Sequence, residues 1–131
     1  MIAIPDPIFL TLDEVLALHE GQLRRYGGLS GLRDERLLAS ALGAVEATFD
    51  GAFLNEGVAE MAAAYLVNIL RNHPFLDRNK RTALACALTF LWMNDTKVEA
   101  AEDELVAIVL AVAEGRSTKA DVAVFLGEHV L

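Results

Sequence analysis

The sequence predicts a compact all-α protein whose residues 1–131 form one domain. A length of 131 residues is typical of a single domain, and 54% hydrophobic residues are enough to build a substantial core. Aromatic residues make up only 7% of the chain, so that core is expected to consist mainly of Leu, Ala and Val. Apolar residues recur at helical spacing over most of the chain, which makes a bundle of helices the expected architecture.

The first predicted helix begins in residues 11–14, Thr-Leu-Asp-Glu, which have the pattern of a capping box. The pair of glycines at 27 and 28 is typical of a helix end. His19 falls on this helix, where a buried structural role or a surface position is expected rather than a catalytic one. A second helix is predicted over residues 34–44, after a loop rich in Gly and Ser.

Residues 48–53, Thr-Phe-Asp-Gly-Ala-Phe, carry the signal of a short β-hairpin. The Asp-Gly pair stands between apolar residues, as in two-residue hairpin turns. An ordinary exposed loop is the alternative interpretation of the same residues. The all-α prediction therefore includes one short hairpin as its only candidate for strand structure.

Two strongly apolar helices are predicted in the middle of the chain. The first covers residues 59–70 and ends before Pro74, because the residue that precedes a proline is pushed out of the α region. The second begins at residue 79 or 80 and runs through residue 92. Two more helices are expected towards the C-terminus, one over residues 102–115 with acidic residues in its first turn, and one from a cap at 117 or 118 to about 128.

Residues 72–82, Asn-His-Pro-Phe-Leu-Asp-Arg-Asn-Lys-Arg-Thr, join the two central helices and concentrate positive charge. Four of the chain's eleven Lys and Arg residues fall in positions 71–81, although the net charge of the protein is −8. The start of a helix presents unpaired backbone N–H groups and a partial positive charge. Cations there oppose the helix dipole unless an anion is bound. The sequence therefore predicts a phosphate-binding site at this turn.

Two side chains of the turn could carry out chemistry on a bound phosphate. His73 could accept a proton from a hydroxyl, because histidine is the residue type whose ordinary pKa lies closest to neutrality. Asp77 could cap the following helix or hold a divalent cation. Taken singly, each feature has a simpler interpretation: a cap for the His or the Asp, and a solvated face for the cations. Their joint spacing favours the phosphate site.

Composition also limits the classes of function. The acidic balance argues against direct nucleic-acid binding, which needs an extended basic surface. No apolar run is long enough to span a membrane, and the N-terminal residues lack the basic region of a signal peptide. The single Cys86, inside an apolar helix, is typical of a reduced cytoplasmic protein and is expected to be a packing residue.

Residues 73–82, HPFLDRNKRT, resemble the active-site motif of the Fic/Doc family, in particular its death-on-curing (Doc) branch. The Fic pattern His-x-Phe-x-(Asp/Glu)-Gly-Asn-Gly-Arg-x-x-Arg is matched at His73, Phe75, Asp77, Asn79 and Arg81. Lys80 replaces the second glycine and Leu84 replaces the final arginine. Both replacements resemble the Doc toxins, which are protein kinases rather than AMP transferases. Residues 19–29 are also similar to Doc proteins, so the resemblance covers nearly the whole chain.

The resemblance implies a Fic-type helical bundle and a role for each residue of the motif. His73 would be the general base towards a target hydroxyl, and Asp77 would bind Mg²⁺. Asn79 and the amides around it would form an anion hole, and Lys80 and Arg81 would hold the phosphates of ATP. The implied catalytic residues are His73, Asp77, Lys80 and Arg81, and the implied nucleotide-binding residues are Arg78, Asn79, Lys80 and Arg81.

Arg78 departs from the family pattern, which has Gly or Ala in this place. A large side chain there either crowds the anion pocket or adds a phosphate ligand. The hairpin at residues 48–53 is the candidate for the flap that aligns a target segment by strand addition in Fic-type proteins.

As a whole, the resemblance implies a Doc-like toxin of a type II toxin–antitoxin system, restrained by a Phd-type antitoxin. Such a protein would transfer the γ-phosphate of ATP to a Thr or Ser hydroxyl of elongation factor Tu and so arrest translation. Two alternatives stay open. One is a Fic-type AMP transferase, which Lys80 and Leu84 disfavour. The other is a catalytically degenerate Fic fold kept as a binding module, which Arg78 supports.

Overall fold

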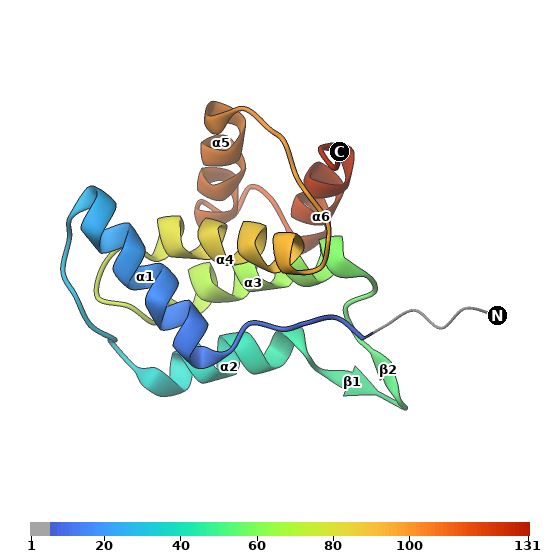
Figure 1. Ribbon diagram of the computed structural model, residues 1–131, viewed down its shortest axis with the longest axis horizontal. Helices are drawn as coiled ribbons and strands as arrows, with labels where there is room; N and C mark the ends of the chain where they lie inside the picture. The colour runs from blue at the N-terminus through green and yellow to red at the C-terminus, as the bar shows by residue number, and fades with distance from the viewer. Residues whose placement is uncertain (1–5) are drawn as a thin grey trace.

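The computed structural model describes residues 6–131, and these residues form six helices and one small hairpin (Figure 1). The elements in chain order are α1 (Leu12–Tyr26), α2 (Glu35–Val45), β1 (Thr48–Phe49), β2 (Ala52–Phe53), α3 (Val58–Asn72), α4 (Asn79–Met93), α5 (Glu102–Ala113) and α6 (Lys119–Glu128). The predicted all-α bundle with one hairpin is confirmed. No helix within residues 6–131 combines the length and the apolarity needed to cross a membrane.

The core is organised around α3 and α4. α3 is buried without a break from Met61 to Val67, as expected of a helix that is apolar on most of its sides. The helices α2, α4, α5 and α6 all contact α3, and α1 packs mainly on α4. Figure 1 shows α5 and α6 on one side of the α3–α4 pair and α2 on the other. Cys86 lies in this core, where burial raises the pKa of its thiol to about 12, which confirms that it is a packing residue.

Side-chain caps fix where α1 and α6 begin. The Thr11 hydroxyl accepts the Glu14 N–H at 3.1 Å, and the Glu14 carboxylate accepts the Thr11 N–H at 2.8 Å. Thr118 and Asp121 make the same reciprocal pair at the start of α6. Each pair satisfies two backbone donors that a helix start leaves free, which confirms the capping box predicted for α1 and Thr118 as the cap of α6.

The hairpin of residues 48–53 is confirmed. β1 and β2 pair in antiparallel register. The turn residues Asp50 and Gly51 have positive φ angles of 54° and 82°, as a type I′ turn requires. The hairpin projects from the helices (Figure 1), and the Phe49 side chain beside its turn is 75% exposed.

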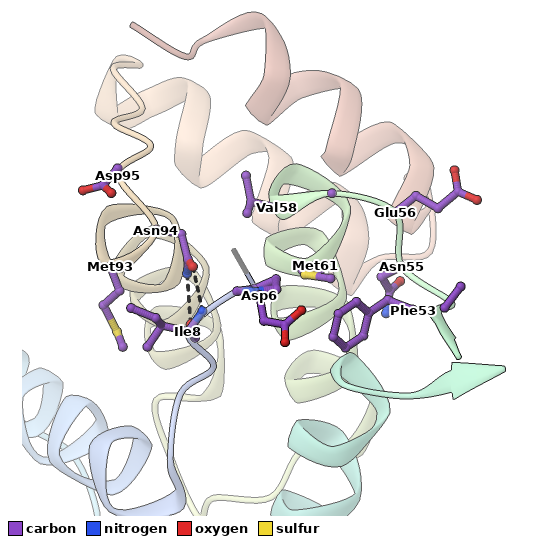
Figure 2. A pocket seen from close by; sticks show the side chains of 13 residues that line it. Asp6, Ile8, Phe53, Asn55, Glu56, Val58, Met61, Met93, Asn94 and Asp95 are labelled. Atoms are coloured by element: carbon purple, nitrogen blue, oxygen red, sulfur yellow. Dashed lines mark hydrogen bonds between the residues drawn. The ribbon is translucent and has the colours of Figure 1, made fainter. Parts of the chain in front are cut away.

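Two side chains tie the extended residues 6–11 to the central helices. The Leu10 N–H donates to the Tyr65 hydroxyl of α3 at 3.0 Å. The Asn94 side-chain amide, just after α4, accepts the Ile8 N–H at 2.7 Å and donates to the Ile8 carbonyl at 2.9 Å (Figure 2). These bonds satisfy backbone groups that have no helix or sheet partner.

Candidate active site

The connection between α3 and α4 begins and ends with a left-handed residue. His73 ends α3 with φ 48° and ψ 56°, and its N–H donates to the Ile69 carbonyl at 2.9 Å. Arg78 precedes α4 with φ 63° and ψ 30°. Left-handed backbone costs a residue other than glycine about 1–2 kcal/mol. Contacts from the rest of the molecule must therefore hold this connection, residues 73–78, in place.

The loop between α1 and α2 supplies the first of these contacts through Arg33. Its guanidinium donates to the carbonyls of His73 and Asn72, both at 2.8 Å. Its backbone N–H donates to the Pro74 carbonyl at 2.7 Å. The same loop accepts a hydrogen bond from the motif, because the Leu76 N–H donates to the Gly31 carbonyl at 3.1 Å. The loop between α1 and α2 thus holds the end of α3 in place, including His73, the predicted general base.

Asn79 closes the connection from the inside. Its side chain is buried, with Oδ1 accepting the Phe75 N–H at 3.0 Å and Nδ2 donating to the Phe75 carbonyl at 2.9 Å. The amide group is therefore occupied by the protein backbone. Any contact between Asn79 and an anion would use its backbone N–H at the start of α4.

Phe75 and His19 form the floor beneath the connection. Phe75 is fully buried, and its ring stacks on the His19 ring with centroids 3.8 Å apart and planes 10° apart. The His19 Nε2 lies 2.9 Å from the Asp77 carbonyl. Because a carbonyl only accepts, Nε2 carries the proton. His19 is buried, as one of the two predictions for it required, and it supports the motif from α1.

Asp77 contributes an ionised carboxylate. Its Oδ2 accepts the Leu29 N–H at 3.1 Å, and its Oδ1 accepts the Arg78 N–H at 2.8 Å. These two backbone hydrogen bonds hold the pKa of Asp77 below its ordinary value, and the Arg78 charge adds to the effect. Asp77 does not cap α4, because the residue before that helix is Arg78 and no side chain of the described residues caps the helix start. The capping interpretation was wrong.

The three cations of the turn differ in what they contact. The Arg78 guanidinium donates to the carbonyls of Tyr26 and Gly27, both at 2.8 Å. The Arg81 guanidinium carbon lies 3.5 Å from the centre of the Tyr26 ring. Lys80 is exposed, and within residues 6–131 its ammonium makes no hydrogen bond or ion pair. Lys80 and Arg81 thus retain donors for a ligand, whereas Arg78 is engaged with the end of α1.

The predicted site residues surround one hollow of about 260 Å³. Its lining consists of His73, Leu76, Asp77, Arg78, Asn79, Lys80 and Arg81. Pockets that enclose a drug-sized ligand usually measure about 300–1,000 Å³, so this one suits phosphate groups with the remainder of a nucleotide outside it. The N-terminal N–H groups of α4, with no side-chain cap among the described residues, add backbone donors at the same place.

Comparison with known proteins identifies the family. The sequence model of the Fic/DOC family matches residues 9–91, which contain the whole connection, all of α3 and most of α4. The chain is 37% identical over 111 residues to a protein of Escherichia phage P1 named protein kinase doc, covering 85% of this chain and 86% of the phage protein. The chain belongs to the Fic/DOC family. It is also 40% identical over 84 residues to a protein of Mycolicibacterium smegmatis named toxin Doc, covering 60% of this chain and 65% of that one.

The Asp77 carboxylate of this Fic/DOC domain suits a magnesium ion that is also coordinated by phosphates. Within residues 6–131 no group of three or more His, Cys, Asp or Glu side chains comes together as a metal site. Asp77 keeps free lone pairs on both oxygens, because each accepts one hydrogen bond and a carboxylate can accept about four. Mg²⁺ is commonly held by one or two carboxylates together with substrate phosphates. Asp77 suits that mode of binding.

A larger hollow of about 760 Å³ lies elsewhere in this Fic/DOC domain, beside the N-terminal segment (Figure 2). Its floor is apolar and includes Phe53 and Met61, and its rim carries the carboxylates of Asp6, Glu56 and Asp95. No Lys or Arg lines it. Such a rim repels a polyphosphate, so charge and not size separates this hollow from the smaller one as a candidate anion site.

Three contributors to the site lie outside the motif and were missed as site residues. Arg33 had no sequence signal, because its partners are backbone carbonyls about forty positions away. His19 and Tyr26 fall in the segment 19–29, which is similar to Doc proteins. The similarity did not indicate that either residue contacts the motif. That similarity was the only signal that could have marked them.

Proposed function

We propose that this Fic/DOC protein is a Doc-like toxin of a type II toxin–antitoxin system, acting as a Mg²⁺- and ATP-dependent protein kinase. It transfers the γ-phosphate of ATP to a Thr or Ser hydroxyl of a translation factor, elongation factor Tu, and so arrests translation. The observation that carries the proposal is the single hollow in which His73, Asp77, Lys80 and Arg81 meet at the uncapped start of α4. The names of the two relatives, a protein kinase and a toxin, support it.

In the proposed reaction the target hydroxyl oxygen attacks the γ-phosphorus. A new O–P bond forms, and the bond between the γ-phosphorus and the oxygen that bridges to the β-phosphate breaks. ADP leaves with that electron pair. The proton of the hydroxyl goes to the His73 imidazole, which is exposed at the edge of the hollow and held there by the Arg33 contacts to its backbone.

Stabilisation of negative charge is the main catalytic contribution in this proposal. Lys80 and Arg81 offer side-chain donors to the transferred phosphoryl group, and the first N–H groups of α4 offer backbone donors. Asp77 would hold Mg²⁺ on the phosphates, and the ion would neutralise part of their charge. The hydrogen bonds that Asp77 accepts from Leu29 and Arg78 fix its orientation.

A Phd-type antitoxin is the proposed restraining partner, in the cytoplasm and without direct contact of this chain to nucleic acid. The hairpin is the proposed docking site for the target. Its exposed position and the 75% exposed Phe49 suit the addition of an extended segment to a strand edge.

The test is label transfer from ATP to elongation factor Tu and, in parallel, to whole bacterial lysate. Purified protein and Mg²⁺ are supplied with ATP labelled on the γ-phosphate or on the α-phosphate. We expect label from the γ-position only. His73→Ala should lower the rate by about 10²–10⁴-fold, the usual contribution of a general base, whereas the exposed surface variant Arg36→Ala should react like the wild type.

The other outcomes each favour a different function. Label from the α-position would establish an AMP transferase and contradict the kinase proposal. Absence of label from both positions in the lysate, with a folded protein, would contradict any transferase activity and favour a binding module.

A further inference from the structure

The end of α1 and the residues after it, Tyr26 to Leu29, contact the motif at four places. The Arg81 guanidinium carbon lies over the Tyr26 ring, and the carbonyls of Tyr26 and Gly27 accept hydrogen bonds from the Arg78 guanidinium. The Leu29 N–H donates to the Asp77 carboxylate. A Cβ atom on Gly28 would lie 2.6 Å from Asp77 Oδ2, so only glycine allows this approach without displacement. This segment therefore fits the motif closely, although about 50 positions separate them in the sequence.

We propose that Tyr26 is a positioning residue, which holds the Arg81 guanidinium flat on its ring so that the N–H edges face a phosphate of the bound nucleotide. The inference rests on the proposed function, since it deepens the role given there to Arg81. A guanidinium stacked by its face keeps its five N–H donors free at the edges. Within residues 6–131 Arg81 makes no ion pair or side-chain hydrogen bond, so these donors are available.

Stacking has an energetic reason to matter at this position. Both residues are exposed, and a free arginine side chain in water samples many rotamers, a freedom that an anion has to restrict on binding. The Tyr26 ring limits this motion before the ligand arrives. A cation–π contact of this kind at an exposed site changes an equilibrium constant by about two- to fivefold, and by more when water is excluded.

Arg78 takes part in the same arrangement. Its guanidinium donates to the backbone carbonyls of Tyr26 and Gly27. These two hydrogen bonds hold the backbone of Tyr26 against the start of α4 and so set the position of the Tyr26 ring. This gives the large side chain at position 78 a function other than a phosphate ligand or an obstruction of the hollow. Arg78 positions Tyr26, and Tyr26 positions Arg81.

The experiment measures the affinity of the purified protein for two anions, inorganic tripolyphosphate and Mg²⁺-ATP, by calorimetry. Tyr26→Leu removes the ring and should weaken both affinities about two- to fivefold. Tyr26→Phe keeps the ring and should bind like the wild type. Trp92→Leu is the matched control, because it also replaces an exposed aromatic residue with leucine but lies at the far end of α4 from the motif.

A double-mutant cycle separates positioning from a merely structural role. In an Arg81→Ala background, Tyr26→Leu should cause no further loss of affinity, since the residue through which it acts is absent. A second loss of about two- to fivefold in that background would overturn the proposal. So would a Tyr26→Leu variant that binds both anions like the wild type, and in that case the kinase proposal would be unaffected.

The failure of the kinase proposal gives a different result. If the wild type binds tripolyphosphate, the variants follow the expected order and yet no label is transferred to any protein, the kinase proposal fails and the positioning role stands. If the wild type binds neither anion, both proposals are overturned.

Discussion

Backbone strain and side-chain contacts oppose each other at Arg78. Its left-handed φ of 63° costs a residue other than glycine about 1–2 kcal/mol. The guanidinium donates to the carbonyls of Tyr26 and Gly27, and a hydrogen bond of this kind contributes about 0.5–1.5 kcal/mol net. The two effects are similar in size, which explains how an arginine is accommodated in a position where the family pattern has a small residue.

Arg78→Ala and Arg78→Gly separate these two effects. Alanine loses both hydrogen bonds and keeps the backbone strain, whereas glycine loses the bonds and removes the strain. We expect the glycine variant to be more stable than the alanine variant by about 1 kcal/mol, with the wild type close to the glycine variant. Urea unfolding followed by circular dichroism gives the three free energies. An alanine variant at least as stable as the glycine variant would contradict a left-handed backbone at this residue.

The hydroxyl of Thr82 is fully buried in α4 and has no hydrogen-bond partner among the described residues. An unsatisfied buried hydroxyl costs about 1–3 kcal/mol, and valine has nearly the same shape. Thr82→Val should therefore raise the free energy of unfolding by about 1 kcal/mol. Thr89→Val, at a half-buried threonine of the same helix, is the control and should change it little. A destabilised Thr82→Val protein would mean that the hydroxyl has a partner.

Motif spacing predicted which side chains would lie together, but not what each would contact. His73, Asp77 and Lys80 surround one hollow because the turn is short and Pro74 forces the chain out of α3. The side chain of Asn79 turns inward instead, because one amide group can satisfy both the N–H and the carbonyl of Phe75. Nothing in the spacing of these residues distinguishes an inward amide from one that faces a ligand.

Among the secondary-structure elements, the loop between α1 and α2 does most to hold the motif. Arg33→Ala removes two hydrogen bonds from the carbonyls of Asn72 and His73, so the left-handed end of α3 should open more easily. We expect amide hydrogen exchange at His73, Phe75 and Leu76 to become about tenfold faster, the equivalent of roughly 1.4 kcal/mol. Arg36→Ala, which removes only an exposed pair with Asp34, is the control and should leave it unchanged. Equal exchange in both variants would refute a clamp by Arg33.

His129, directly after α6, connects that helix to α5. Its Nδ1 lies 2.7 Å from the Phe125 carbonyl, and its Nε2 lies 3.3 Å from a Glu104 oxygen. The Phe125 carbonyl first, and then the Glu104 carboxylate, raise the pKa of His129 above its ordinary value of 6.5. Protonation therefore stabilises the folded state. This contribution is complete below the unfolded-state pKa and is lost as the pH rises through the raised folded-state pKa.

His129→Gln removes this titration. The difference in free energy of unfolding between wild type and variant should be largest below pH 6.5 and should shrink as the pH rises past the folded-state pKa. Urea unfolding at a series of pH values measures the difference. Glu104→Gln should reduce its pH dependence in part, because the Phe125 carbonyl remains. A difference that does not vary with pH would contradict the link between α5 and α6.

Local signals predicted the elements well, and long-range contacts escaped them. Capping boxes, Pro74 and the glycines after α1 act within a few residues of the helix ends that they fix. The segment 26–34 contacts the motif over a separation of about 40 to 50 positions. These contacts are made by backbone carbonyls, a carboxylate, guanidinium groups and an aromatic ring, and such contacts leave no periodicity in the sequence.

The charge distribution of the whole molecule favours anion binding at the motif over the rest of the surface. A net charge of −8 repels a nucleotide from most of the surface, and the larger hollow of Figure 2 has an acidic rim. Only the start of α4 combines Lys80, Arg81 and open backbone N–H groups in one hollow of the described structure. The fold thus serves to concentrate a small part of its positive charge at one turn.

The most direct test of this account is a titration of the ¹⁵N-labelled protein with Mg²⁺-ATP, followed through the backbone amide signals. The account predicts shifts at residues 73–81 and at Tyr26 to Leu29, saturating together, with the signals around Phe53 and Met61 unchanged. A Lys80→Ala, Arg81→Ala double variant should lose these shifts. Shifts confined to the acidic hollow, or a full response in the double variant, would contradict the assignment of the start of α4 as the phosphate site.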